Sequence, residues 1–169
     1  LILAAYHAIS SGETEKCKDV FGGDLKYLTN VESPGDKLAK DYETTLEINL
    51  GDFKKALKNQ EKDLNFEGEP SSWVKTPERT KGGMVKEINI CSKNFKGTKI
   101  RQIFSLRSSD FDLNYNQEKN SFIFTVKGYG HGVGMSQTGA QYMAKNGSNY
   151  KQILSWYYPN TSISKLKNL

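Results

Sequence analysis

The sequence predicts an α+β fold in a single domain, built mainly from antiparallel strands with three or four short helices. Its 169 residues fit one domain and are enough for a sizeable core. Several segments alternate apolar and polar residues, and turn signals rich in Gly, Pro and Asn separate them. Strand and helix patterns do not alternate regularly, so a doubly wound parallel sheet is disfavoured.

The first third of the chain is expected to contain short strands and polar loops. Apolar residues predict strands at 1–7 and 27–31, and strict alternation at 44–50 is typical of a half-buried strand. Polar or Gly-containing turns are expected at 10–17, 21–24 and 32–40.

The middle of the chain predicts two short helices and two strands. Asp52 can cap a helix that places Phe53, Ala56 and Leu57 on one face. An exposed excursion at 58–70 precedes strands at 71–75 and 84–91. Thr98 can cap a second helix, whose apolar face consists of Ile100, Ile103 and Phe104.

The last third predicts a hairpin followed by two helices. Strands at 111–115 and 121–127 flank NQEKN, and FIFTV in the second is strongly β-prone. A helix at 136–145 is expected to turn Ala140, Met143 and Ala144 inward. Ser148 can cap a final helix that ends before Pro159 and carries an apolar stripe of Tyr150, Ile153, Leu154 and Tyr157.

Composition constrains function only loosely. Lys and Arg number 24 against 19 Asp and Glu, a formal charge of +5, and no dense basic block appears. A solvated basic surface explains this excess more simply than nucleic-acid binding, which we do not expect. No apolar run approaches the ~18 residues of a membrane span. Cys17 and Cys91 leave both a disulfide and free thiols open.

The segment 128–140, GYGHGVGMSQTGA, is the most informative stretch. Alternate glycines around His131 imply positive φ or close backbone approach. Neither a dinucleotide-binding nor a phosphate-loop pattern fits. His131 either bonds the turn or serves as a ligand-site or acid–base group. Ser136 is expected to cap the following helix, whereas Gln137 fits capping and substrate contact equally well.

The second informative segment is 6–14, YHAISSGET. Small hydroxyl residues there either stabilise a local turn or contact a ligand. His7, Cys17, Glu13 and His131 are weak metal-ligand candidates, because no recognised ligand spacing is present. The sequence contains no serine-hydrolase elbow, and nothing places a base beside Cys17 for nucleophilic catalysis.

These segments resemble the stage II sporulation protein D family. GYGHGVGMSQTGAQYMAKNG with YKQILSWYYPNT is similar to the family's C-terminal signature. AYHAISSGETEKCKDVFGGDLKYLTNVESPGD is similar to its middle motif, and LRSSDFDL to its Arg-Ser-x-x-Phe element. The three stretches are collinear and span nearly the whole chain, so residues 1–169 resemble the larger, C-terminal part of such a domain.

The resemblance implies a peptidoglycan lytic transglycosylase, which cleaves the bond between N-acetylmuramic acid and N-acetylglucosamine and leaves a 1,6-anhydro end. This chemistry needs one carboxyl group, first as acid and then as base, whereas ordinary glycosidases need two. The family's catalytic glutamate precedes the middle motif, so we expect the general acid upstream of Leu1. Glu13 is a weak local candidate, because an exposed carboxyl keeps a pKa near ~4.3.

The resemblance also implies which residues surround the glycan. They are His131, Gln137, Ser10, Ser11 and Tyr129, with Arg107 as support. Ser10 departs from the cysteine of many members, and Thr138 from a common aromatic residue. No cofactor is required. Some members bind zinc, so zinc is conceivable here, but the missing thiol weakens that expectation.

Family membership further implies a place and partners. The expected location is the extracytoplasmic, cell-wall side of the membrane during engulfment, with any membrane attachment through an N-terminal anchor. The expected partners are peptidoglycan strands and stage II sporulation proteins P and M. The alternative is a non-catalytic wall-binding module that enhances an N-acetylmuramoyl-L-alanine amidase, as other members of the family do.

Overall fold

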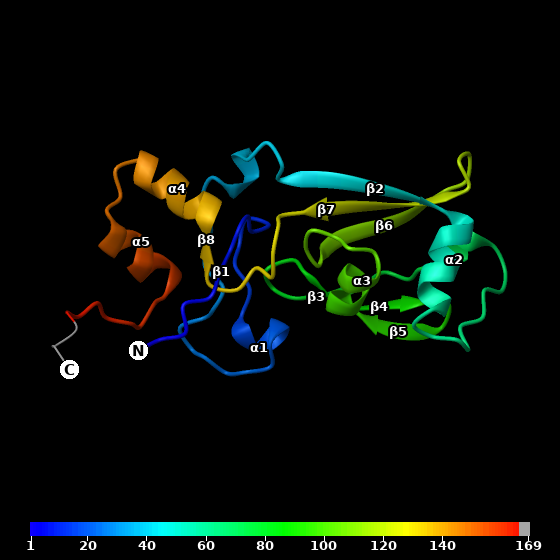
Figure 1. The fold of residues 1–169 in the computed structure, drawn as a ribbon, viewed down its shortest axis with the longest axis horizontal. Helices are drawn as coiled ribbons and strands as arrows, with labels where there is room; N and C mark the ends of the chain where they lie inside the picture. The colour runs from blue at the N-terminus through cyan, green and yellow to red at the C-terminus, as the bar shows by residue number, and fades with distance from the viewer. Residues whose placement is uncertain (166–169) are drawn as a thin grey trace.

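The computed structural model describes residues 1–165 and shows an elongated molecule with two lobes (Figure 1). Two three-stranded antiparallel sheets form one lobe, and short helices with a two-stranded parallel pair form the other. The predicted α+β class is confirmed. Five α-helices occur in this range, because a short helix that we did not expect, α1 (Cys17–Val20), joins the four expected ones.

The first sheet has the strand order β2 (Glu43–Asn49), β7 (Ser121–Lys127), β6 (Asp110–Asn116). The central strand β7 pairs antiparallel with both neighbours. Its alternating sequence turns Phe122, Phe124 and Val126 into the core. The predicted strand at 44–50 and the predicted hairpin are confirmed.

The second sheet consists of β3 (Glu78–Arg79), β4 (Val85–Ile90) and β5 (Lys93–Lys96). β4 confirms the strand predicted at 84–91. The strand predicted at 71–75 is wrong, because the chain there begins with the 3-10 turn η2 (Pro70–Ser72) and only Val74 makes a bridge. Pro70 fixes φ and cannot donate a backbone hydrogen bond, which favours the turn.

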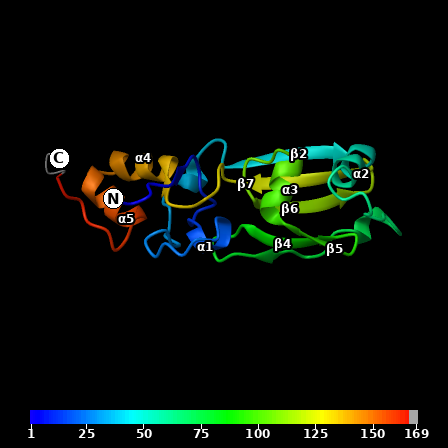
Figure 2. The same ribbon diagram turned by 60° about the horizontal axis from the view of Figure 1, so that its bottom comes forward.

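An aromatic core joins both sheets to α2 (Leu50–Lys58) and α3 (Gly97–Ile103) (Figure 2). Phe53 of α2 stacks on Phe122 with ring centroids 3.9 Å apart, and on Phe104 at 5.3 Å. Trp73 adds a further stacked ring at 6.1 Å from Phe122. These large buried rings stabilise the lobe mainly by removing apolar area from water.

The second lobe brings the N-terminal segment to the C-terminal helices. β1 (Tyr6–His7) pairs in parallel with β8 (Met135–Ser136), beside α4 (Gln137–Lys145), α5 (Tyr150–Tyr157) and the 3-10 turn η1 (Asp36–Leu38). Its core contains Cys17, Leu28, Val133, Ile153, Tyr157 and Tyr158. The strand predicted at 1–7 is only two residues long, and that predicted at 27–31 is a turn and loop.

Three helix starts differ from prediction. Asn49, not Asp52, caps α2 by accepting the Asp52 N–H at 2.9 Å. Thr98 lies inside the first turn of α3, which has no side-chain cap, and Asn149 rather than Ser148 caps α5. Asn caps as well as Asp or Ser, so neighbouring cap residues compete and tertiary packing decides between them. The cap predicted at Ser136 is confirmed.

Both cysteines are free thiols in the structure. Cys17 is buried in the core of the second lobe, and Cys91 packs against the core of the first. Within residues 1–165, no helix is long and apolar enough to cross a membrane.

We expect Gly97→Ala to destabilise the fold by about 1–3 kcal/mol, because overpacking carries that cost. A Cβ at Gly97 would lie 1.9 Å from the Val85 carbonyl oxygen, where α3 packs on β4. Gly51→Ala in α2 is the control: its Cβ would meet only the Asn49 amide oxygen, at 3.3 Å. Urea denaturation measures both, and equal stability of the two variants would contradict this packing.

Candidate functional site

The Gly-rich segment 128–134 runs from β7 to β8 and lies along residues 5–11 (Figure 1). The Tyr129 N–H donates to the Ile9 carbonyl at 2.7 Å. Gly134 has φ +75°, and a Cβ there would lie 2.1 Å from the Ala5 carbonyl oxygen. Glycine is therefore required by both backbone conformation and space. The two segments that the sequence singled out are thus one structural unit.

His131 lies half-buried at the centre of this unit. Its Nδ1 accepts the Val133 N–H at 3.1 Å, and its ring lies 5.0 Å from that of Phe21. Burial lowers the pKa of His131, and the positive charge of Arg101 lowers it further, against a hydrogen bond to the Tyr6 backbone. The neutral ring stabilises the turn through this hydrogen bond. The sequence left a structural role and a ligand-site or acid–base role open for His131, and this is the structural one. Direct contact with a substrate stays a prediction.

His7 lies beneath His131, with ring centroids 5.8 Å apart. Its side chain is buried, and Nδ1 donates to the Val133 carbonyl at 3.2 Å. Burial lowers the pKa of His7 to about 4. The other nitrogen, Nε2, is buried and has no hydrogen-bond partner among the described residues. The imidazole is therefore neutral at physiological pH.

The Asp36 side chain bonds both motif segments, through Ser10 in one and Ser136 in the other. Its fully buried carboxylate accepts hydrogen bonds from the Ser10 N–H (3.0 Å), the Ser10 hydroxyl (2.5 Å) and the Ser136 hydroxyl (2.8 Å). Ser136 in turn caps α4 through the Gly139 N–H at 3.2 Å. The Ser10 side chain is thus engaged by Asp36, and its contact with a ligand stays a prediction.

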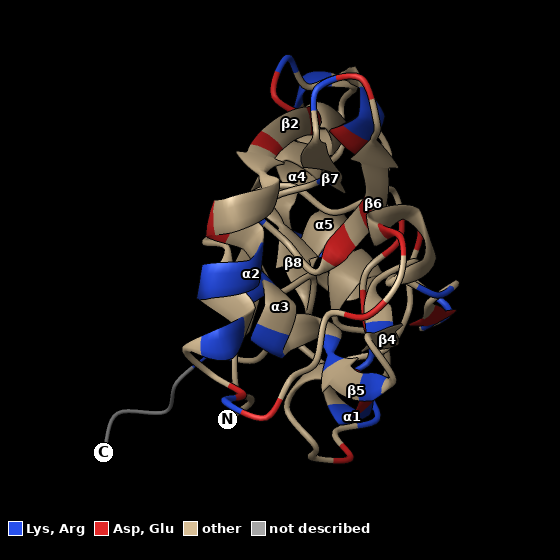
Figure 3. Cartoon of the chain, turned by 90° about the vertical axis from the view of Figure 1, so that its right-hand side faces the viewer, with Lys and Arg blue, Asp and Glu red and all other residues tan. Residues whose placement is uncertain are grey.

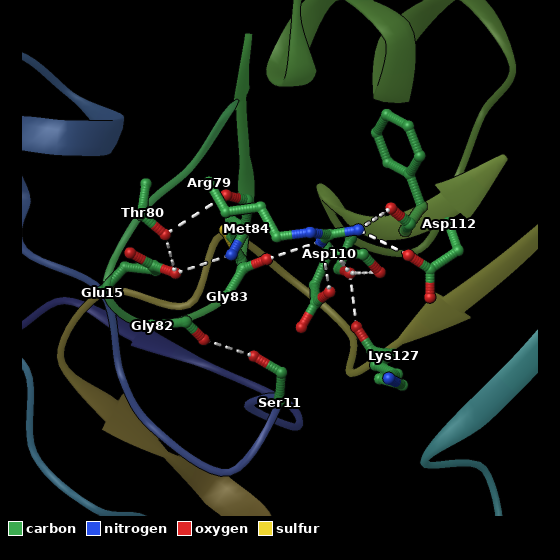
Figure 4. Close-up of polar contacts among 12 residues, drawn as sticks. Ser11, Glu15, Arg79, Thr80, Gly82, Gly83, Met84, Asp110, Asp112 and Lys127 are labelled. Atoms are coloured by element: carbon green, nitrogen blue, oxygen red, sulfur yellow. Dashed lines mark hydrogen bonds and ion pairs between the residues drawn. The ribbon is translucent and has the colours of Figure 1, made fainter. Parts of the chain in front are cut away.

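Glu15 is a buried carboxyl group beside the Gly-rich segment (Figure 4). Its Oε1 accepts from the Thr80 hydroxyl at 2.7 Å and from the Met84 N–H at 3.2 Å. Its Oε2 is buried without a partner among the described residues. Burial raises the pKa of Glu15, so the protonated form is favoured. A Cβ on Gly82 would collide with this carboxyl group at 2.4 Å.

A second buried carboxyl group, Asp110, lies on the other side of the 80–84 loop (Figure 4). Burial raises the pKa of Asp110, and a Ser11 hydrogen bond and the Arg79 charge oppose that shift. Arg79 contacts Asp110 at 3.2 Å and Asp112 at 2.6 Å. The Ser11 hydroxyl donates to the Gly82 carbonyl at 3.0 Å. Ser11 of the middle motif therefore contacts the 80–84 loop directly.

Of the predicted site residues, Tyr129 and Gln137 are exposed, and Arg107 is half-buried. The Arg107 guanidinium lies 4.4 Å from the centroid of the Tyr129 ring, a cation–π contact. Tyr129 is 47% exposed, and Gln137 is exposed in the first turn of α4. The Arg107 carbonyl accepts the Gly130 N–H at 2.9 Å, which fixes the LRSS segment against the Gly-rich one.

A cleft of about 750 Å³ opens beside this unit, between α1 and the second sheet. Phe21, which contacts His131, and Thr80 and Met84, which bond Glu15, line part of it. Its remaining walls carry basic, acidic and small polar residues together with Gly22, Val20 and Val85. This cleft is large enough for a small ligand.

Of the weak metal and acid candidates, only His7 and His131 have neighbouring rings, with centroids 5.8 Å apart, among the described residues. Within residues 1–165, no three His, Cys, Asp or Glu side chains are arranged to hold a metal ion. Cys17 points into the apolar core of the second lobe. Glu13 is part-exposed and pairs with Lys81 at 3.2 Å.

Asp36, Glu15 and Asp110 were missed as site residues by the sequence analysis. Each follows small or polar residues in an apparently solvated loop, and nothing local distinguishes them from exposed acids. The available signal for Asp36 was the SPGD turn, and for Glu15 its place three residues after the Ser-Ser-Gly turn. Burial of these carboxyl groups depends on segments that are distant in sequence.

The sequence is similar to several known proteins. No family model matches the sequence. Stage II sporulation protein D of Bacillus subtilis is 34% identical over 164 residues, covering 97% of this chain and 46% of that protein. Its counterpart in Bacillus amyloliquefaciens is 34% identical, with 45% of that protein covered. The amidase enhancer of Bacillus subtilis is 23% identical, with 97% of this chain and 30% of the enhancer covered.

The fold is an α+β domain in which two motif segments pair with each other, and its relatives include sporulation proteins. It therefore belongs to a class of proteins connected with sporulation. The chain belongs to the stage II sporulation protein D family, as its similarity to the two Bacillus sporulation proteins shows. It spans about half the length of the curated sporulation proteins that it matches.

We expect stability to fall as pH drops from about 6.5 to about 4, because His7 resists protonation only in the folded state. Its folded pKa of about 4 lies below the value of 6.5 for a free imidazole, so the unfolded chain binds the proton first. The loss is on the order of 3 kcal/mol. Urea denaturation across this range should show a shallower pH dependence for His7→Asn than for wild type. Identical slopes would contradict a buried neutral His7.

Proposed function

We propose that this chain forms the glycan-binding part of a peptidoglycan lytic transglycosylase. The supporting observation is that the Gly-rich segment pairs with the middle motif and leaves the Tyr129 ring exposed beside the Arg107 guanidinium. Similarity to stage II sporulation protein D supports a role in sporulation and at the cell wall. An exposed tyrosine suits the apolar face of a sugar ring.

The proposed reaction uses one carboxyl group. It protonates the glycosidic oxygen as the bond to the muramyl C1 breaks. It then removes the proton from the muramyl C6 hydroxyl as that oxygen attacks C1, which closes the 1,6-anhydro ring. No water is consumed, and the carboxyl group ends protonated as it began. We place this acid in the part of the protein that precedes Leu1.

The carboxyl groups of this chain fit that role less well. Glu15 has the raised pKa that a general acid needs, but its side chain is fully buried behind Gly82. Glu13 is accessible but engaged by Lys81. We therefore assign Glu15 to positioning, because it holds the 80–84 loop against the Gly-rich segment through Thr80 and Met84.

The second candidate function is a non-catalytic wall-binding module. The relative named amidase enhancer favours it, as does the lack of an accessible carboxyl group with raised pKa among the described residues. In either case we propose action on the extracytoplasmic face, on peptidoglycan, together with stage II sporulation proteins P and M. We do not propose nucleic acid as a partner, or any metal as a required cofactor.

The decisive test incubates glycan strands stripped of peptides with this chain and, in parallel, with the full-length protein that contains it. We expect 1,6-anhydromuramyl products, detected by mass spectrometry, from the full-length protein only. Products from the chain alone would place the acid within residues 1–169, and Glu15→Gln against Glu13→Gln would then identify it. Binding without products from either form would favour the amidase-enhancer function.

We expect Tyr129→Ala to weaken binding of this chain to the glycan strands by about three- to tenfold, the range for losing an aromatic contact. Tyr150→Ala is the control, since that tyrosine is 63% exposed on α5, outside both the Gly-rich segment 128–134 and residues 5–11. Isothermal titration calorimetry measures both. Equal losses in the two variants would show that Tyr129 has no special role.

A further inference from the structure

Two aromatic side chains are exposed at the end of the molecule that lies opposite the two sheets, where α4 and α5 are found (Figure 1). Trp156 on α5 is 44% exposed, and Tyr142 on α4 is 37% exposed. Neither belongs to the Gly-rich segment 128–134 or to residues 5–11, so the proposed function does not use them. Single exposed aromatic residues are common on protein surfaces, so what matters is how these two rings are held.

One four-residue segment, 32–35, contacts both rings. The Trp156 Nε1–H donates to the Glu32 carbonyl at 2.6 Å. The Tyr142 ring lies on Gly35, where a Cβ would fall 2.2 Å from the ring and where a φ of +85° also requires glycine. Three peptide steps separate Glu32 from Gly35, so their α-carbons are at most about 11 Å apart. The two rings are therefore anchored at the two ends of one short segment.

The middle of this segment is held between α4 and α5. Ser33 is buried, and its hydroxyl lies 2.6 Å from the Tyr157 hydroxyl. Gly139 leaves room for this contact, because a Cβ there would lie 2.1 Å from the Tyr157 hydroxyl oxygen and 2.3 Å from the Ser33 Oγ. The segment cannot shift without breaking a buried hydrogen bond. Rings that are already ordered in this way lose little conformational entropy when a ligand covers them.

The two helices that carry the rings have few charges of their own. α4 and α5 contain one charged residue each, Lys145 and Lys151. Lysines gather instead on α2, at the opposite end of the molecule (Figure 3). Charge attracts a polyanion to a surface, and these helices offer little of it. Their exposed rings therefore favour a ligand that binds through apolar faces and hydrogen bonds.

A sugar polymer fits this arrangement better than a protein partner. A stable protein interface covers about 800 Å² on each partner and keeps charged residues out of its centre. Here the segment that carries both rings includes the exposed Glu32, which forms none of the six ion pairs of residues 1–165. A sugar ring needs only an aromatic face and a nearby group that accepts hydrogen bonds from its hydroxyls, which the Glu32 carboxylate supplies.

We propose that Trp156 and Tyr142 form a second glycan-binding site, on which N-acetylglucosamine residues of a peptide-free strand stack. This inference rests on the proposed function, because it assigns a further contact with the same polymer. A long strand held at one site has a raised local concentration at the other. The second site thus keeps the strand on this lobe between encounters with Tyr129.

The test is a titration of this chain, followed by proton–nitrogen NMR, with a peptide-free tetrasaccharide of alternating N-acetylglucosamine and N-acetylmuramic acid. The chain has two tryptophans, and the buried Trp73 provides an internal control. We expect the Trp156 indole N–H signal to shift saturably while the Trp73 signal stays in place. High salt should not weaken this binding, because ring stacking is not screened as ion pairs are.

Tyr142→Ala should raise the Kd read from the Trp156 signal by about three- to tenfold, the range for losing one aromatic contact. Tyr142→Phe keeps the ring and should bind like wild type. Tyr150→Ala is the matched control, because it removes an exposed tyrosine from α5 that lies six residues before Trp156. It should leave the Kd unchanged. The wild-type titration tests the site even if Tyr142→Ala fails to fold.

The same spectra separate this site from the proposed function. Shifts of the Tyr129 and Gly130 amides with an unmoved Trp156 indole would overturn the second site and leave the proposed function intact. Unmoved signals at all three residues would overturn both. A Trp156 signal that moves with protein concentration and not with the sugar would show that the rings pair two copies of this chain, which also overturns the site.

Discussion

The Asp36 carboxylate accepts hydrogen bonds from Ser10 in the middle motif and from Ser136 at the start of α4. Because Asp36 is fully buried, these donors replace water for a group that would otherwise be costly to bury. The contact fixes both ends of the interlocked unit, since residues 5–11 and 128–134 then lie edge to edge. The cap of α4, the position of His7 under His131 and the exposed face of Tyr129 depend on that register.

Burial shifts the pKa values of the titratable groups in the interlocked unit. It lowers the pKa values of His7 and His131 and raises the pKa of Glu15. The Arg107 guanidinium, 4.4 Å from the centroid of the Tyr129 ring, carries positive charge beside the unit. Such a surface is suited to holding an extended ligand in place while an acid acts on it, and it is equally suited to binding without chemistry. Similarity to both a sporulation protein and an amidase enhancer is consistent with one scaffold carrying two uses.

Local patterns predicted the parts of the fold that local physics determines. The β6–β7 hairpin, the β2 strand and the face of α2 follow from alternation and helical spacing, and the structure has them. The strand predicted at 71–75 is wrong. Pro70 favours a 3-10 turn there, and only Val74 makes an isolated bridge. The Gly-rich motif was visible as a motif, but its buried partners Asp36 and Glu15 were not. The segments that bury these two carboxyl groups are distant in sequence and meet only in the folded chain. The residues next to Asp36 and Glu15 in the sequence therefore do not predict their burial.

Amide hydrogen exchange of Asp36→Asn is the most direct test of the central claim, that this carboxylate fixes the Gly-rich segment. An asparagine offers only one acceptor oxygen, so either Ser10 or Ser136 loses its partner. We expect the Tyr129 and Gly130 amides to exchange at least about tenfold faster than in wild type, because opening the segment becomes easier. The Phe124 amide in β7 should keep its wild-type rate. Unchanged protection of Tyr129 and Gly130 in a folded variant would contradict the account.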